Sequence, residues 1–172
     1  MKSLTCLALV LLSGCAYHLD ENYTLEIDPS FSADQQETVI TSADDWMNNL
    51  DGVFSYQPCV GIGCGGKGRA KIRVHAVSQA FVDSKRGEDA LGYTERYYGT
   101  DDSDVYIPVD VSYGAGDLQQ LITHELGHSL GAFHISEGNV MCAYSDCAAK
   151  TVQCADRNMV MALRGYFQKT CK

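Results

Sequence analysis

The chain has few basic residues for its length. Its 172 residues include 13 Lys and Arg against 22 Asp and Glu, which gives a formal net charge of −9. So little positive charge argues against nucleic acid as a partner, because no basic patch is available to neutralise phosphates. No internal repeat, low-complexity tract or second domain is evident. The length suits one domain with a hydrophobic core, for which a monomer is the default expectation.

Long apolar segments are also lacking. The run from Leu4 to Leu12 follows Lys2 and is too short to span a bilayer as a helix. It ends in Leu12-Ser13-Gly14-Cys15, which resembles the lipobox of bacterial lipoproteins, whose Cys becomes the acylated first residue of the mature protein. We therefore predict a lipoprotein-type signal peptide over residues 1–14 and lipidation at Cys15. An ordinary cleaved signal peptide and an uncleaved anchor are the alternatives.

This reading makes residues 15–22 a tether and residues 23–172 the folded domain. It implies export and a lipid anchor in the cell envelope. Ala16, rather than Asp, follows the Cys, and in Gram-negative lipoproteins this favours the outer membrane.

No Cys-x-x-Cys pair is present, which argues against a structural zinc site built from Cys, although that alternative stays open. Six Cys remain beyond Cys15, and an even number in an exported domain indicates disulfide bonds. Local spacing suggests the pairs Cys59–Cys64 and Cys142–Cys147, leaving Cys154–Cys171.

Hydrophobic periodicity predicts strands and helices along one domain. The expected strands are Tyr23–Asp28, Val53–Gln57, Lys71–Val77, Leu91–Tyr97 at an edge, and Asp104–Val111. The expected helices run from a Ser32 cap to about Leu50, from an Asp117 cap through Leu118 to about Leu130, and over Ala155–Phe167. The fold class is α+β, with α/β as the alternative: a small mixed twisted sheet with these three helices.

The same patterns assign faces to two of these elements. In the first strand, Thr24 and Glu26 should lie on a polar face opposite the apolar residues. In the last helix, the residues expected to point inward are Met159, Val160, Leu163 and Phe167.

Three further features have less specific interpretations. The Gly-rich stretch over residues 61–68 lacks a following Gly-Lys-Ser/Thr, so we expect a disulfide-stapled loop rather than a phosphate site. His75 should be a surface histidine on a strand's polar face. Asp101, Asp102 and Asp104 indicate a solvated turn, or a loop that binds calcium.

The strongest pattern is a run of three histidines around one predicted helix end. His124 and His128 are four residues apart, so their imidazoles stand on one helical face and can bind one zinc ion. Gly131 lets the chain turn sharply, which can bring His134 to the same metal. Three protein ligands leave a fourth position for water, as in catalytic zinc sites.

Glu125 directly follows the first of these histidines. A carboxylate there can act as general base toward a metal-activated water and then return the proton to a leaving amine. Five fixed positions of named type rarely match by chance, and here they also fall on a helix. The pattern predicts metal-assisted hydrolysis of a peptide bond.

The stretch from His124 to His134 resembles the metzincin metallopeptidases, matching their motif His-Glu-x-x-His-x-x-Gly-x-x-His at every fixed position. That resemblance implies a zincin fold, one catalytic zinc ion and endopeptidase activity on polypeptides. The family also has a Met-containing turn beneath the metal, and Met141 fits that structural role.

Within this family the chain is most similar to the matrixins. The order of a strand, a helix containing Trp46, further strands and the zinc helix is alike, as is the closing Asp156…Val160-x-x-Leu163-Arg164-Gly165-Tyr166. Ile135 after the last histidine fits no subfamily signature. Tyr144 lies three residues after Met141, where astacin- and serralysin-like members place a metal-associated Tyr at two. It is a candidate transition-state stabiliser or a wall residue.

Two other functions compete with the endopeptidase. One is a surface lipoprotein that binds zinc and uses its cleft only for recognition, which would not require Glu125. The other is a zinc amidase acting on cell-wall peptides. We expect a polypeptide substrate to lie along the edge strand Leu91–Tyr97 by strand addition.

Overall fold

The computed structural model describes residues 22–66, 69–88, 90–97, 99–135, 138–143, 149–166 and 170–171. The predicted signal peptide, Cys15 and nearly all of the tether lie outside these ranges, so the structure does not test them. No helix in the described ranges is both long and apolar enough to cross a membrane.

A five-stranded sheet with the order β2-β1-β3-β5-β4 forms the centre of the fold. The strands are β1 (Asn22–Ile27), β2 (Ser55–Val60), β3 (Ala70–Val77), β4 (Tyr93–Arg96) and β5 (Ser103–Pro108). β1 pairs in parallel with β2 and β3, and β3 with β5, whereas β4 runs antiparallel to β5. This mostly parallel sheet, alternating with helices, is a mixed α/β architecture, which corrects the α+β class. The predicted edge strand is confirmed, because β4 ends the sheet.

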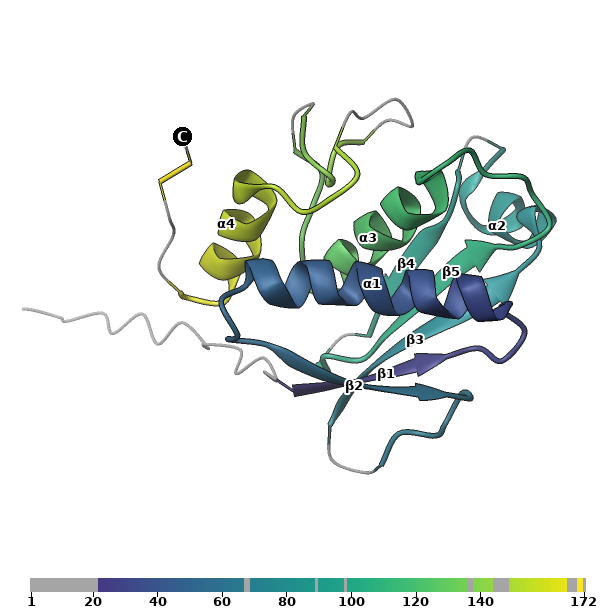
Figure 1. The fold of residues 1–172 in the computed structure, drawn as a ribbon, viewed down its shortest axis with the longest axis horizontal. Coiled ribbons are helices and arrows are strands. Elements are labelled where there is room, and N and C mark those ends of the chain that lie inside the picture. The colour runs from purple at the N-terminus through teal and green to yellow at the C-terminus, as the bar shows by residue number, and fades with distance from the viewer. Residues whose placement is uncertain are drawn as a thin grey trace, which may run out of the picture.

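Within the described residues, four helices accompany the sheet: α1 (Ala33–Asn49), α2 (Gln79–Arg86), α3 (Asp117–Ser129) and α4 (Cys154–Leu163). The long helix α1 lies across the sheet beside α3 (Figure 1). The predicted Ser32 cap is confirmed as a capping box with Gln35. Helix α2 was not predicted, because eight residues give little periodic signal. Its Phe81 ring packs on Tyr93 and Tyr106, whose side chains project from the sheet face opposite the core.

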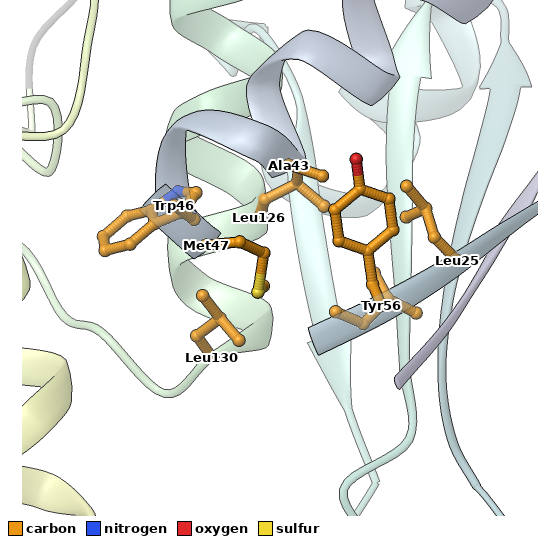
Figure 2. A pocket seen from close by; sticks show the side chains of 8 residues that line it. Leu25, Ala43, Trp46, Met47, Tyr56, Leu126 and Leu130 are labelled. Carbon is orange, nitrogen blue, oxygen red and sulfur yellow. The ribbon is translucent and has the colours of Figure 1, made fainter. Parts of the chain in front are cut away.

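The core lies between the sheet and the helices α1 and α3. From α1 and its C-cap it takes Trp46 and Leu50, whose side chains are completely buried. A small apolar gap remains where α1 and α3 meet the sheet (Figure 2). It is lined by Leu25, Ala43, Trp46, Met47, Tyr56, Ile72, Leu126 and Leu130.

Several strands and helices begin or end at residues other than the predicted ones. β2 continues through Pro58, which an edge strand tolerates because one side needs no ladder hydrogen bond. β5 ends at Pro108 rather than Val111, and α3 begins at Asp117 with Gly116, not Asp117, as its cap. α4 ends at Leu163, whose side chain is 48% exposed, so its predicted inward position is wrong. Val160 is buried as expected, and Phe167 lies outside the described residues.

The predicted polar face of β1 is buried, which is a second correction. β1 is an inner strand, and the Gly-rich loop after β2 folds over its outer face. The Glu26 carboxylate accepts hydrogen bonds from the backbone N–H groups of Gly63 (2.7 Å) and Gly65 (3.1 Å). It also pairs with Lys71 at 3.2 Å and Arg73 at 3.6 Å. A Cβ at Gly65 would lie 2.5 Å from Thr24, so the loop needs glycine there.

Two carboxylates of the acidic cluster, Asp102 and Asp104, pair with Arg73 and are not simply solvated. Asp102 accepts hydrogen bonds from the backbone N–H of Lys71 (2.9 Å) and from the Arg73 guanidinium (2.8 Å). Asp104 lies 2.9 Å from His75 Nε2 and accepts a hydrogen bond from Tyr97. The His75 ring also stacks on Tyr106 and is half-buried. Within the described residues these carboxylates form no group suited to a metal, so the calcium interpretation gains no support.

Two of the three predicted disulfides, Cys59–Cys64 and Cys154–Cys171, are confirmed. Cys142 is also disulfide-bonded. Its predicted partner Cys147 lies outside the described residues.

We predict that Glu26→Gln lowers the free energy of unfolding by about 3 kcal/mol at neutral pH, because it removes one partner from a buried ion cluster. Burial alone would raise the pKa of Glu26, but hydrogen bonds from Gly63, Lys71 and Gly65 outweigh it and hold the pKa below the ordinary value of 4.5. Between the pKa of Glu26 in the folded protein and its higher pKa in the unfolded chain, the unfolded chain binds more protons. The stabilisation that the charged Glu26 gives to the fold is therefore lost as pH falls below about 4.5.

Urea unfolding of the wild type and the variant across this pH range is the measurement. The exposed Glu37 on α1 provides the matched control, Glu37→Gln, which should change the free energy of unfolding little. Equal effects of the two substitutions at neutral pH would contradict the role given to Glu26.

Candidate metal centre

Helix α3 carries the first two histidines and is fixed against α1 along its buried face. Leu121, Ile122 and Leu126 of that face are buried. The Trp46 indole N–H donates a hydrogen bond of 2.7 Å to the backbone carbonyl of Thr123. His124 and His128, one turn apart, lie on one side of the helix, next to the third histidine.

Gly131 ends α3 and reverses the chain, as predicted. It adopts a φ of 97°, a left-handed conformation that favours glycine. The Gly131 N–H donates to the His128 carbonyl and the Ala132 N–H to the Gly127 carbonyl, both at 2.9 Å. This turn returns His134 to the other two histidines.

The three imidazole Nε2 atoms converge. Nε2 of His124 lies 3.1 Å from that of His128, and Nε2 of His134 lies 3.2 Å from each of them. Tetrahedral zinc with Zn–N bonds of 2.0–2.1 Å would separate its nitrogen ligands by about 3.3 Å. The spacing therefore suits a single zinc-sized ion, and the triad could hold a metal.

Backbone carbonyls fix the ring tautomers at two of these residues. Nδ1 of His124 lies 2.8 Å from the Val140 carbonyl oxygen, and Nδ1 of His128 lies 2.8 Å from that of Ala132. A carbonyl oxygen can only accept, so each Nδ1 carries the proton and each Nε2 presents a lone pair. Two lone pairs facing each other at 3.1 Å repel, and a bound cation removes that repulsion. The donor set thus fits a metal.

Electrostatics keeps these rings in the form that binds metal. Burial lowers the pKa of His124 to about 4, the Val140 hydrogen bond opposes this, and the neighbouring His128 and His134 lower it further. Burial also lowers the pKa of His128. Both rings are therefore neutral at neutral pH, as metal ligation requires.

Met141 lies beneath the helix and is completely buried, as the predicted structural Met-turn requires. It contacts Gly127, the residue directly before His128. A Cβ at Gly127 would lie 2.6 Å from the Trp46 ring and closer still to Met141 Sδ. The lack of a side chain at Gly127 lets the Trp46 and Met141 side chains close under the ligands.

Asp156 of α4 holds the turn that contains Met141. This fully buried carboxylate accepts hydrogen bonds from the N–H groups of Val140 (3.0 Å), Met141 (3.1 Å) and Gln153 (2.8 Å). Val140 in turn accepts the hydrogen bond from His124. The Met141 N–H and the Val140 carbonyl belong to the same peptide group. Asp156 therefore fixes the carbonyl that binds the His124 ring. Sequence reasoning included Asp156 in a closing pattern but gave it no role.

Glu125 points from α3 toward β4 and is 5% exposed. The Thr94 hydroxyl lies 2.8 Å from Glu125 Oε2. Burial raises the pKa of Glu125 to about 7, although the Thr94 hydrogen bond and the positive charge of Arg86 act in the opposite direction. A carboxyl group with this pKa can accept and release a proton near neutral pH.

The structure thus brings His124, His128 and His134 together and places Met141 below them. Tyr144 lies outside the described residues, so its predicted role is not tested. Sequence reasoning missed Thr94, because no motif links a strand residue to a helix 31 positions later.

No family model and no curated protein matches this sequence. Among solved structures, the fold is similar to that of archaemetzincin from Methanopyrus kandleri, with a TM-score of 0.56. The alignment has 12% sequence identity and covers 89% of this chain and 98% of that chain. At this identity the similarity concerns the fold alone.

We predict that Gly127→Ala destabilises the fold by about 2 kcal/mol, because the added Cβ overpacks the contact with Met141 and Trp46. Alanine otherwise favours a helix over glycine, so a loss of stability must come from this contact. Chemical denaturation measures the change, with Gly66→Ala as control, since a Cβ at Gly66 meets no atom within 4 Å. A Gly127→Ala variant more stable than the wild type would refute the packing argument.

Proposed function

We propose that this protein is a zinc-dependent endopeptidase. The observation that carries the proposal is the convergence of three imidazole Nε2 atoms within 3.2 Å, with Glu125 adjacent in sequence to the first of them. The similarity in fold to a protein named archaemetzincin supports the same class.

In this proposal His124, His128 and His134 hold one zinc ion and leave a coordination position free. A zinc ion bound there would polarise a peptide carbonyl and lower the pKa of water. The protein's contribution is to keep the His124 and His128 rings in place, through the carbonyls of Val140 and Ala132.

Glu125 is the proposed general base and then general acid. Its carboxylate takes one proton from water and delivers the same proton to the nitrogen of the leaving amine. A pKa raised to about 7 by burial suits both transfers at neutral pH, because neither the charged nor the neutral form is strongly favoured.

The edge position of β4 supports an extended polypeptide as the substrate. β4 pairs with β5 on one side only, so its other side can pair with a peptide by strand addition. Thr94 of this strand contacts α3, which carries the metal ligands, so a peptide on β4 would run beside the candidate centre.

The recognition protein and the cell-wall amidase remain alternative proposals. The buried, hydrogen-bonded Glu125 favours an enzyme over a recognition protein, since binding alone does not need this carboxylate. Export with a lipid anchor at Cys15, and stabilisation of the transition state by Tyr144, also stay proposals that rest on the sequence.

We predict that Glu125→Gln retains one zinc per chain but lowers kcat/KM at least about 100-fold on a quenched-peptide library, because general acid–base catalysis is lost. Zinc is quantified in both proteins, and Glu88→Gln, at an exposed position on the loop after α2, is the control. The wild type and Glu88→Gln should cleave equally.

A zinc-loaded wild type that cleaves no peptide in the library would count against the endopeptidase. Cleavage of purified cell wall but not of denatured casein would instead favour the amidase.

A further inference from the structure

We infer that Thr94 is a positioning residue for Glu125. Its hydroxyl holds one oxygen of the carboxylate, so that the other oxygen is the one that exchanges protons. This inference rests on the proposed endopeptidase function and adds to it a residue outside the histidine motif.

The Thr94 hydroxyl lies 2.8 Å from two acceptors, Glu125 Oε2 and the Glu125 backbone carbonyl. A hydroxyl group has one proton and can donate only one full hydrogen bond. The backbone carbonyl of Glu125 already accepts the helical hydrogen bond from Ser129 four residues later, inside α3. The carboxylate oxygen has no such partner, so it is the acceptor that needs the Thr94 proton.

The two carboxylate oxygens of Glu125 are therefore not equivalent. Oε2 is bound to Thr94, whereas Oε1 has no hydrogen-bond partner among the described residues. Oε1 is therefore the oxygen left to exchange a proton, while Oε2 is anchored to Thr94.

The β4–β5 pairing directs Thr94 toward α3. Thr94 lies opposite Val105, which is completely buried in the core between the sheet and its helices. Tyr93, the preceding residue, stacks on Tyr106 on the other face of the sheet. Because side chains alternate along a strand, Thr94 must point to the helix side.

Gly92 permits the close approach that this hydrogen bond requires. A Cβ at Gly92 would lie 3.1 Å from the Tyr106 carbonyl oxygen, 3.2 Å from Leu121 and 3.5 Å from Glu125 Cγ. The chain entering β4 is therefore packed directly on the Glu125 side chain. The contact between Thr94 and Glu125 belongs to a close interface between β4 and α3. In this interface Gly92 lies between the Tyr106 carbonyl oxygen and the side chains of Leu121 and Glu125.

A fixed carboxylate should matter for the chemical step more than for substrate binding. Without the hydroxyl, the Glu125 carboxylate can rotate about its Cγ–Cδ bond. Oε1 then faces the proton of the reacting water or amine less often. This loss of orientation lowers kcat, because proton transfer needs hydrogen-bond geometry. KM should change little, since Thr94 is not proposed to bind substrate.

The test compares Thr94→Val, which removes the hydroxyl at nearly constant shape, with Thr94→Ser, which keeps it. In the full-length chain loaded with zinc, we expect Thr94→Val to lower kcat about tenfold with KM within about twofold of the wild type. Thr94→Ser should stay within about threefold of the wild-type kcat. Zinc content and thermal midpoint are measured for each protein, and Thr41→Val on the exposed side of α1 is the control.

An unchanged kcat in Thr94→Val would overturn the inference. So would an equal loss of kcat in Thr94→Val and Thr94→Ser, because rescue by the retained hydroxyl is what separates positioning from packing. A wild-type protein that binds zinc and cleaves nothing would overturn the proposed function, and the inference with it. That outcome is read from the wild type alone and is distinct from a failure at Thr94.

Discussion

Three imidazole nitrogens lie within 3.2 Å of one another, and backbone carbonyls have fixed the protons of two of the rings on the far side. Such an arrangement is unfavourable without a cation, so the surrounding structure must hold it in place. Helix α3 supplies two of the rings one turn apart, and the turn at Gly131 brings the third. Much of the domain can be understood as support for this convergence.

The support comes from two directions. On the apolar side, Trp46 of α1 and Met141 meet at Gly127, where the helix has no side chain to keep them apart. On the polar side, the buried Asp156 of α4 binds the turn that contains Met141, and that turn accepts the hydrogen bond from His124. The sheet also supports the site. Both faces of its inner strand β1 are buried, and its short edge strand β4 packs beside α3.

Local patterns in the sequence predicted much of this arrangement. The spacing of the three histidines and Gly131, the Ser32 cap and two disulfides depend on neighbours in the chain. The structure confirms the cap and the two disulfides and brings the three histidines together. What the sequence did not show depends on pairing between distant segments. Glu26 appears polar in an alternating strand, yet it is buried because a loop 37 residues later covers it. Thr94 and Asp156 likewise gain their roles only when β4 and α4 pack beside the histidines.

The central claim is that the three histidines form one open, nitrogen-ligated metal site. Its most direct test is zinc K-edge X-ray absorption on the zinc-loaded protein. The account predicts three imidazole nitrogens at about 2.0–2.1 Å, one further oxygen ligand and no sulfur. A sulfur shell at about 2.3 Å, or a fourth histidine, would contradict it, because either would describe a closed structural site.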